Sequence, residues 1–371
     1  MPSQLAASRT LELILRPLTP LHVWSGRRLL MGLDVVRRGG NLCFVDIERL
    51  PPEMVNQLYS TPAEQIPRVL EKYSAQLPCR LEVKFTGFLP PKAQILELNQ
   101  YVVPGSTLKG YIRTAVLYLM LKAIGEKGLA EALRRGVNLD EKPKNVAQGL
   151  EAEFFRAPRP GGEGGFVDSF QSLLVSDPGV VVDPRCLVVS EIRVVELLGR
   201  ELKRIASQYA LLATCGELKY RVSVRAPGKS AVSNIARPLR EHFKDIERLR
   251  VLEEVDLIKA LRDFGCYILS KELERVKSFK DLAGYADMLE DLHRRYCSKP
   301  SDCVVARIGY STGLTAKTVL GVVKEADPQL YQEVRSLMER SLHHTWDELT
   351  IKLVETPRGL VGLGWCELCV H

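Results

Sequence analysis

One stretch of the sequence predicts a tight turn that leads directly into a helix: Val103-Pro-Gly-Ser-Thr-Leu-Lys-Gly-Tyr-Ile-Arg-Thr-Ala115. A proline and a glycine mark the turn, Ser106 is a favourable N-cap, and apolar residues then recur at helical spacing. Lys109 and Arg113 are four residues apart, so they share one face beside the free N–H groups and the positive end of the helix dipole. Two cations and several amide donors predict an anion site here. The alternative is a buried helix that carries two solvated charges.

The size and composition indicate a globular protein. The length of 371 residues exceeds what one small core organises, so we expect two domains. No apolar run reaches the roughly 18 residues that span a bilayer, and the first residues lack the features of a signal peptide. We therefore expect a cytoplasmic protein without a membrane partner. Asparagine is sparse and arginine outnumbers lysine, which is typical of thermophiles.

The net charge of +7 is concentrated in one part of the chain. Between Lys219 and Lys244 there are seven basic residues and one acid, Glu241, which suggests a polyanionic partner. In a strand over residues 218–225, Lys219, Arg221 and Arg225 would share one face and leave the other face apolar. Such a cationic face suits a nucleic-acid backbone. The alternatives are solvated surface charge and an edge strand whose cations discourage aggregation.

Strands and helices follow one another without regular βα repeats, which favours an α+β architecture with antiparallel sheets. The region from about 235 to 296 is helical and charge-dense, and we expect it to be an insertion or a lid. The expected strands cover residues 10–23, 33–36, 42–47, 79–88, 94–103, 172–177, 186–190, 218–225, 349–354 and 362–370. The other expected helices cover 52–58, 62–73, 106–124, 129–135 and 328–344, and a glycine-rich loop covers 157–165.

Nine cysteines form an odd set without the regular spacing of a secreted disulfide framework. Cys366 and Cys369 are the close pair, and Cys297 and Cys303 could complete a zinc site with them. A strand would point Cys366 and Cys369 to opposite faces, so we favour buried thiols and expect no metal and no cofactor. In a thermophile, intracellular disulfides are a further alternative.

A second candidate for phosphate binding is Gly309-Tyr-Ser-Thr-Gly313-Leu-Thr-Ala-Lys317-Thr318. Its glycines allow backbone amides to converge on a phosphate, and Lys317 lies one turn into whatever helix follows. The spacing matches neither a P-loop nor a dinucleotide-binding fingerprint, so this motif alone is a weak signal. A further glycine-rich segment, from Thr356 to Trp365, approaches a strand.

Taken in order, these motifs resemble the RAMP proteins of CRISPR effector complexes. Within that group, the chain resembles the Csm-family subunit that caps the 3′ end of the guide RNA in type III-A complexes. The departures are Trp24, where the family has a small residue, and Val361-Gly362, where a proline is usual. The matching segments are 19–26 (Thr-Pro-Leu-His-Val-Trp-Ser-Gly), 103–115, 175–177 (Val-Ser-Asp), 308–313 (Ile-Gly-Tyr-Ser-Thr-Gly) with Lys317-Thr318, and 362–365 (Gly-Leu-Gly-Trp).

The resemblance implies two ferredoxin-like (RRM-like) modules, which we assign to residues 1–210 and 211–371. It also implies a noncatalytic subunit that binds guide RNA (crRNA) and is needed for guide maturation and complex assembly in antiviral defence. Its expected partners are other Csm subunits, especially the filament backbone subunit. The implied RNA contacts are Gly105, Ser106, Lys109 and Arg113 on the helix, Gly309, Gly313 and Lys317 on the glycine turn, and His22 and Ser25 in the first loop. The cationic strand adds Lys219, Arg221 and Arg225.

Two other functions stay open. Repeat-cleaving CRISPR enzymes are built on the same module, so a metal-independent RNA endonuclease could use His22 as general acid or base, with Asp168 or Asp177 assisting. A histidine after a strand is more often structural, and Asp177 could simply cap a turn. The second alternative is an interaction protein that recruits host nucleases through the helical region 235–296.

Overall fold

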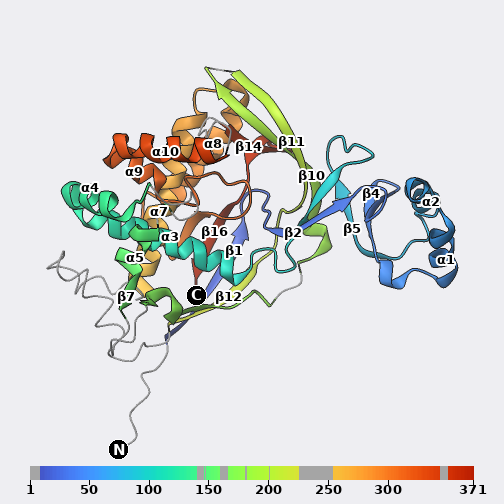
Figure 1. Ribbon diagram of the computed structural model, residues 1–371, viewed down its shortest axis with the longest axis horizontal. Helices are drawn as coiled ribbons and strands as arrows, with labels where there is room; N and C mark the ends of the chain where they lie inside the picture. Colours follow the sequence, from blue (N-terminus) through green and yellow to red (C-terminus); the bar gives the residue numbers. More distant parts are fainter. Residues whose placement is uncertain are drawn as a thin grey trace, which may run out of the picture.

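The computed structural model describes residues 9–139, 146, 148–158, 166–179, 182–199, 201–224, 254–342 and 350–371. In these ranges the chain has the expected α+β architecture, with a five-stranded antiparallel sheet, a larger mixed sheet and several helices (Figure 1). No helix within the described ranges is long and apolar enough to cross a lipid bilayer.

The five-stranded sheet brings together strands from opposite ends of the sequence. Its order is β13-β16-β1-β12-β9, and each neighbouring pair is antiparallel. As expected for the first strand, Leu13 and Leu15 lie in the core and Glu12 is exposed, but Ile14 on the Glu12 face is buried as well. The strands are β1 (Arg9–Pro17), β9 (Leu173–Val175), β12 (Leu218–Val224), β13 (Cys303–Arg307) and β16 (Trp365–Val370).

The mixed sheet is organised around a long antiparallel hairpin of β10 (Leu187–Leu198) and β11 (Glu201–Ala213). Its order is β2-β6-β11-β10-β5-β4-β3, with β14 paired to β10 and to β15. The contacts of β5 with β10 and of β6 with β11 are parallel. The other strands are β2 (Trp24–Leu30), β3 (Val35–Arg38), β4 (Asn41–Val45), β5 (Cys79–Phe85), β6 (Gln94–Leu98), β14 (Thr350–Thr356) and β15 (Gly359–Gly362). Strands β7 (Arg156–Pro158) and β8 (Phe166–Asp168) form a separate short pair.

Only the first residues of the long hairpin, 186–190, are expected from the sequence. The pairing of β10 with β11 shifts register between Val194 and Val195, and this irregularity interrupts the two-residue alternation on which the expectation depends. Gly199, with φ of 59°, helps the chain to reverse between the strands. Near this turn, Leu198 and Ile205 are 43% and 49% exposed.

Helices α7 (Glu254–Val276) and α8 (Ala283–Tyr296) lie in the region expected to be a charged insertion or lid. The described part of this region is not a solvated layer, because α7 packs against α3 (Gly105–Ala123) and β13, while its status as an insertion stays a prediction. Its residues Phe264 and Ile268 are fully buried in the main core. A Cβ added to Gly265 would collide with the carbonyl oxygen of Val305, so helix and strand are in direct backbone contact.

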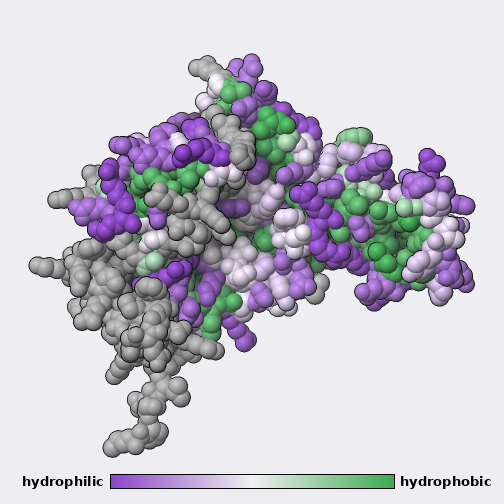
Figure 2. Space-filling model, in the orientation of Figure 1, coloured by the Kyte–Doolittle hydropathy of each residue, from purple (hydrophilic) through white to green (hydrophobic). Residues whose placement is uncertain are grey.

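The remaining helices include short peripheral elements and a small arm. Figure 1 shows α1 and α2 beside β4 and β5, projecting from the rest of the molecule. The arm has a small core of its own, made of Val36, Cys43, Val45, Met54, Leu70 and Leu77. Its surface shows apolar side chains among hydrophilic ones (Figure 2), and Tyr59 is 87% exposed. The helices are α1 (Pro52–Ser60), α2 (Ile66–Lys72), α4 (Gly125–Gly136), α5 (Gln148–Phe155), α9 (Leu320–Ala326) and α10 (Pro328–Leu342).

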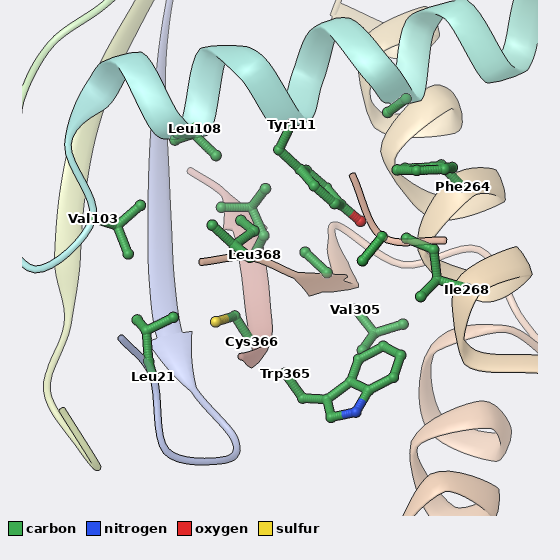
Figure 3. Packing of buried hydrophobic residues seen from close by; sticks show 14 of the residues in the cluster. Leu21, Val103, Leu108, Tyr111, Phe264, Ile268, Val305, Trp365, Cys366 and Leu368 are labelled. Atoms are coloured by element: carbon green, nitrogen blue, oxygen red, sulfur yellow. The ribbon is translucent and has the colours of Figure 1, made fainter. Parts of the chain in front are cut away.

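The main core is shared by both halves of the chain. Figure 3 shows Tyr111 of α3, Phe264 of α7 and Leu368 of β16 in one packed cluster. The boundary expected between residues 210 and 211 falls inside β11, and strands from both sides of it share the five-stranded sheet. The division into two domains stays a prediction.

All nine cysteines lie in the described ranges, and eight of them form disulfides. The pairs are Cys43–Cys79, Cys186–Cys215, Cys266–Cys297 and Cys303–Cys369, while Cys366 is unpaired and buried. The expectation of plain buried thiols is therefore wrong except for Cys366. Disulfides, which were left open as an alternative from the sequence, are therefore what the structure contains.

Removing the Cys303–Cys369 disulfide should destabilise the protein. The sequence separation of 66 residues makes this the longest loop that a disulfide closes here. Replacing both cysteines by serine should lower the free energy of unfolding by about 2–4 kcal/mol, measured by urea unfolding. The same comparison in strong reductant is the control, because the difference should then become small. A difference that is equal with and without reductant would contradict the cross-link.

Candidate functional site

The start of helix α3 already holds an anionic group of the protein. Pro104 is the N-cap, not Ser106 as expected, and the N–H of Gly105 donates to Oδ1 of Asp177 at 2.7 Å. Gly105 is required here because a Cβ would collide with the carbonyl oxygen of Ser176. Ser106 is exposed in the first turn. The Asp177 carboxylate thus takes one of the free N–H groups that were expected to bind a phosphate.

Lys109 and Arg113 are both engaged with the protein. Nζ of Lys109 donates to the carbonyl oxygen of Leu173 at 2.7 Å. Burial lowers the pKa of Lys109, Asp168 opposes this shift and Arg113 adds to it. The Arg113 guanidinium makes two hydrogen bonds to Asp168, of 2.9 and 3.0 Å. It also lies 4.4 Å from the ring centroid of Phe155, so this side chain fastens α3 to its surroundings.

A cleft of about 1140 Å³ lies on the Lys109 side of α3. Its cations face acids: Arg27 and Arg80 both pair with Glu97, at 3.6 and 2.6 Å. Ser25 also donates to Glu97, at 3.0 Å. We call this the Lys109 cleft. Its polar lining includes Ser25, Arg27, Arg80, Glu97, Asn99, Gln100, Tyr101, Ser106, Lys109 and Asp177.

A second hollow, of about 430 Å³, lies on the other side of α3 and has a different charge. We call it the Tyr310 pocket. None of the described residues that line it is acidic. They are Val23, Trp24, Thr107, Gly110, Tyr111, Thr114, Arg307, Ile308, Gly309, Tyr310, Thr312, Ala316 and Lys317.

The glycine turn and the first loop meet at the Tyr310 pocket. Gly309 has φ of 111°, and a Cβ on it would collide with the carbonyl oxygen of His22. The N–H of Tyr310 donates to that same oxygen at 2.6 Å. Gly313 also has a positive φ, of 84°, and is exposed. Two motifs that are far apart in the sequence are therefore joined by their backbones.

Two lysines flank the Tyr310 ring. Nζ of Lys317 and Nζ of Lys352 lie 5.9 and 5.8 Å from its centroid. Neither forms an ion pair with an acid among the described residues. Burial lowers the pKa of both ammonium groups, and for Lys317 the charges of Lys352 and Arg307 lower it further. Lys352 was not among the expected site residues, because a single lysine in an apolar strand gives no signal in sequence.

His22 is buried and has the properties of a structural histidine. Its Nδ1 lies 2.8 Å from the carbonyl oxygen of Leu211, and Nε2 has no hydrogen-bond partner among the described protein atoms. Burial lowers the pKa of His22 to about 4, against the raising effect of the Leu211 carbonyl. The ring is therefore neutral near pH 7 and is not exposed to a substrate.

A buried ion pair fixes Arg307 beneath the Tyr310 pocket. Arg307 and Glu272 are 2.9 Å apart, and each side chain is 4% exposed. Tyr285 donates to Glu272 at 3.1 Å and accepts from Nε1 of Trp365 at 2.8 Å. Burial alone would raise the pKa of Glu272, but Arg307 and Arg275 outweigh it and lower the pKa. The pair therefore stays charged and holds β13 to α7.

The expected site residues are neighbours but do not form one groove. The first turns of α3 separate Ser106 and Lys109, which line the Lys109 cleft, from Gly309 and Lys317 at the Tyr310 pocket. Lys219 and Arg221 are exposed on β12. Arg225 and most of the basic segment up to residue 244 lie outside the described residues.

The cysteines do not offer a zinc site. The ligand atoms of Cys303, Glu367 and Cys369 lie within 4.8 Å of one another, but Cys303 and Cys369 are joined in a disulfide. A disulfide has no thiolate to give to a metal. Cys366 is fully buried, and burial raises the pKa of its thiol. The alternative of zinc bound by Cys297, Cys303, Cys366 and Cys369 is therefore wrong.

The fold is found in CRISPR proteins. The chain superposes on a chain of a Csm–crRNA–target RNA ternary complex of a type III-A CRISPR-Cas system, with a TM-score of 0.68 and 20% identity, covering 97% of this chain and 100% of that one. It also superposes on Csm5 of T. onnurineus, with a TM-score of 0.56 and 18% identity over 95% and 99% of the two chains. The chain has the fold of these Csm proteins. No family model matches the sequence, and no curated protein matches it. The resemblance inferred from the motifs is thus confirmed at the level of the fold.

Acidification should weaken the fold through His22. The pKa of His22 is about 4 in the folded protein and 6.5 ordinarily. The neutral ring therefore contributes about 3 kcal/mol to the free energy of unfolding. This contribution is complete above pH 6.5 and is lost as the pH falls towards 4. His22→Asn keeps a donor for the Leu211 carbonyl and does not titrate. Urea unfolding at pH 7 and pH 4 should therefore show a smaller loss of stability in this variant. Equal losses in both proteins would contradict the neutral, buried state.

The pair of Arg113 and Asp168 should behave as one structural unit. Arg113→Lys should lower the free energy of unfolding by about 1–3 kcal/mol, because lysine cannot make the two-pronged bond. Adding Asp168→Asn to this variant should lower the free energy of unfolding by little more. A double-mutant cycle measures this coupling between the two side chains. Arg294→Lys is the matched control, since Arg294 pairs with Asp291 on the exposed surface. Additive effects of the two substitutions would contradict the coupling.

Proposed function

We propose that this chain is a noncatalytic crRNA-binding subunit of a type III-A Csm effector complex. In this proposal it lies at the 3′ end of the guide RNA and is needed for guide maturation and complex assembly in antiviral defence. The observation that carries the proposal is the Tyr310 pocket, which has cations, a glycine turn and no acid among its described lining residues, in a chain with the fold of Csm proteins. Its partners would be other Csm subunits, especially the filament backbone subunit, with host nucleases as a further partner.

The pocket suits a ribose-phosphate backbone. Lys317 and Lys352 supply positive charge that no described acid neutralises, and burial lowers the pKa of both because it disfavours an ammonium group that has no anion beside it. A phosphate would supply that anion. Gly309 allows the backbone to come close to a ligand because it has no side chain. Contacts of this kind bind any RNA sequence, as a guide-binding subunit requires.

The other expected contacts take different parts in this proposal. Ser106 and Lys109 would meet RNA across the Lys109 cleft, and Arg113 would act indirectly by holding α3 through Asp168. Gly105, Gly313, Ser25 and His22 would shape the turns that border the two hollows. Lys219, Arg221 and Arg225 would extend the cationic surface along β12.

The five-stranded sheet supports a ferredoxin-like module. Without the edge strand β13, its order is β16-β1-β12-β9, with α3 following β1 and α7 following β12. This corresponds to a β-α-β-β-α-β succession with the first strand in the interior of the sheet. A second module, as the resemblance implies, would be built on the mixed sheet around β10 and β11.

The geometry does not favour the endonuclease alternative. His22 is buried and neutral, Asp168 is bonded to Arg113, and Asp177 accepts from the N–H of Gly105. General acid–base cleavage needs two groups that can reach opposite sides of a phosphate.

We also propose a thermophilic, cytoplasmic setting, because disulfide-rich intracellular proteins are typical of hyperthermophiles.

RNA binding should depend on Lys317 and Lys352. Replacing both by glutamine should weaken binding of single-stranded RNA and reduce the slope of log affinity against log salt by about 0.7 per lysine. Fluorescence anisotropy over a salt series measures both effects. Lys280→Gln, at an exposed site outside both hollows, is the control and should leave the slope unchanged. An unchanged slope in the double variant would contradict the proposed phosphate contacts.

The assignment to a Csm complex is tested separately by purification through this chain. We expect co-purified Csm subunits and a defined guide RNA with a repeat-derived 5′ end. Recovery of the chain alone, or with heterogeneous RNA, would contradict the proposed assembly.

A further inference from the structure

We propose that Trp24 and Tyr310 form a stacking site for one nucleobase of the bound RNA. The site would take an unpaired base from single-stranded RNA at the mouth of the Tyr310 pocket, with the adjoining phosphates beside Lys317 and Lys352. This inference rests on the proposed function and adds to it a contact with a base, which the backbone contacts above do not include.

The indole of Trp24 is exposed and held in place. Trp24 is the first residue of β2 and is 38% exposed, although large aromatic side chains are usually well covered. Its Nε1 donates to the carbonyl oxygen of Arg27 at 2.8 Å. Between Trp24 and Arg28, the pairing of β2 with β6 is irregular. A ring fixed in this way loses little conformational entropy on binding.

Tyr310 supplies a second ring at the same opening. The two ring centroids are 6.4 Å apart and their planes are inclined by 56°. The hydroxyl of Tyr310 donates to Gln208 at 3.3 Å, which limits rotation of the side chain. The rings therefore border one hollow without filling it by stacking on each other.

The hollow between the rings and α3 has room for a flat group. Gly110 and Gly309 line it, and a Cβ added to Gly110 would meet no atom within 4 Å. The residues with hydroxyl groups that α3 contributes to the lining are Thr107, Tyr111 and Thr114. Its volume of about 430 Å³ is in the range of small-molecule sites.

Charge distinguishes RNA from an apolar protein segment as the occupant. The guanidinium of Arg28 lies 5.8 Å from the ring centroid of Trp24, and the two lysines lie at a similar distance from Tyr310. Cations that surround aromatic rings are the combination found in single-stranded nucleic-acid sites, where bases stack and phosphates are neutralised. An apolar partner would bury these charges without compensation.

The resemblance of the first loop to the RAMP motif does not explain Trp24. Trp24 stands where the resembling family has a small residue, so the motif itself does not account for an indole at this position. A large exposed ring in a loop that otherwise favours close approach of backbone and ligand needs a separate role. Stacking on a base is the role that its neighbours support.

Binding of two RNAs to the full chain tests the inference. The probes are fluorescein-labelled oligoadenylate of about 12 nucleotides and a ribose-phosphate oligomer of equal length without bases. Trp24→Leu should weaken binding of oligoadenylate by about 5- to 100-fold, and Trp24→Phe should retain most of the affinity. Neither variant should change binding of the abasic oligomer. Tyr59→Leu, an exposed aromatic residue on the arm, is the matched control.

Each result separates this inference from the proposed function. If oligoadenylate binds the wild type with a strong salt dependence and Trp24→Leu leaves its affinity unchanged, the stacking site is overturned while phosphate binding stands. The stacking site is also overturned if Trp24→Leu weakens both probes equally, or if it spares RNA binding and instead blocks assembly with protein subunits. If the wild type binds neither probe, both proposals fail. Thermal unfolding of each variant excludes misfolding as the cause.

Discussion

The backbone junction between the first loop, the glycine turn and the last strand is the constraint on which the site depends. The carbonyl oxygen of His22 accepts from Tyr310, that of Pro20 accepts from Gly364, and that of Gly364 accepts from Ile308. Gly364 has φ of 82°, and a Cβ on it would collide with the carbonyl oxygen of Ile308. Segments from three distant parts of the sequence are thus locked together at backbone distance. Side chains at the junction would separate them, which explains why glycines recur in the motifs.

Charge in this protein divides into cations that hold the fold and cations that face an open hollow. Arg307 and Arg113 each have a carboxylate partner and an aromatic neighbour, so their positive charge is used within the protein. Lys317 and Lys352 have aromatic neighbours but no ion pair among the described residues. In the sequence, Arg113 and Lys317 are equivalent candidates for a phosphate contact. They differ in the structure because Asp168, more than fifty residues away in the sequence, binds Arg113.

The sequence predicted local elements well and long-range pairing poorly. Helix α3 and strand β12 follow from helical spacing or alternation of apolar residues and are found near their expected bounds, whereas the first strand begins as expected but ends at Pro17 instead of residue 23. Most of the hairpin of β10 and β11 is not predictable in this way, because an irregularity breaks its alternation. Charged residues are frequent in helix α7 and indicate a solvated element, although Phe264 and Ile268 lie on its buried side. Similarly, Asp177 at the start of α3 and Lys352 beside Tyr310 arrive from remote segments, which no local pattern reveals.

The position of β16 has a consequence for how the protein is made. Residues 365–370 form an interior strand of the sheet, between β13 and β1, although they follow β1 in the sequence by more than 300 residues. Until these residues leave the ribosome, β1 lacks one of its two neighbours and the surfaces around Leu13 and Leu15 stay open to water. This sheet therefore cannot be completed before β16 has been synthesised, and a product truncated before residue 365 would present an unpaired strand to chaperones and to other nascent chains.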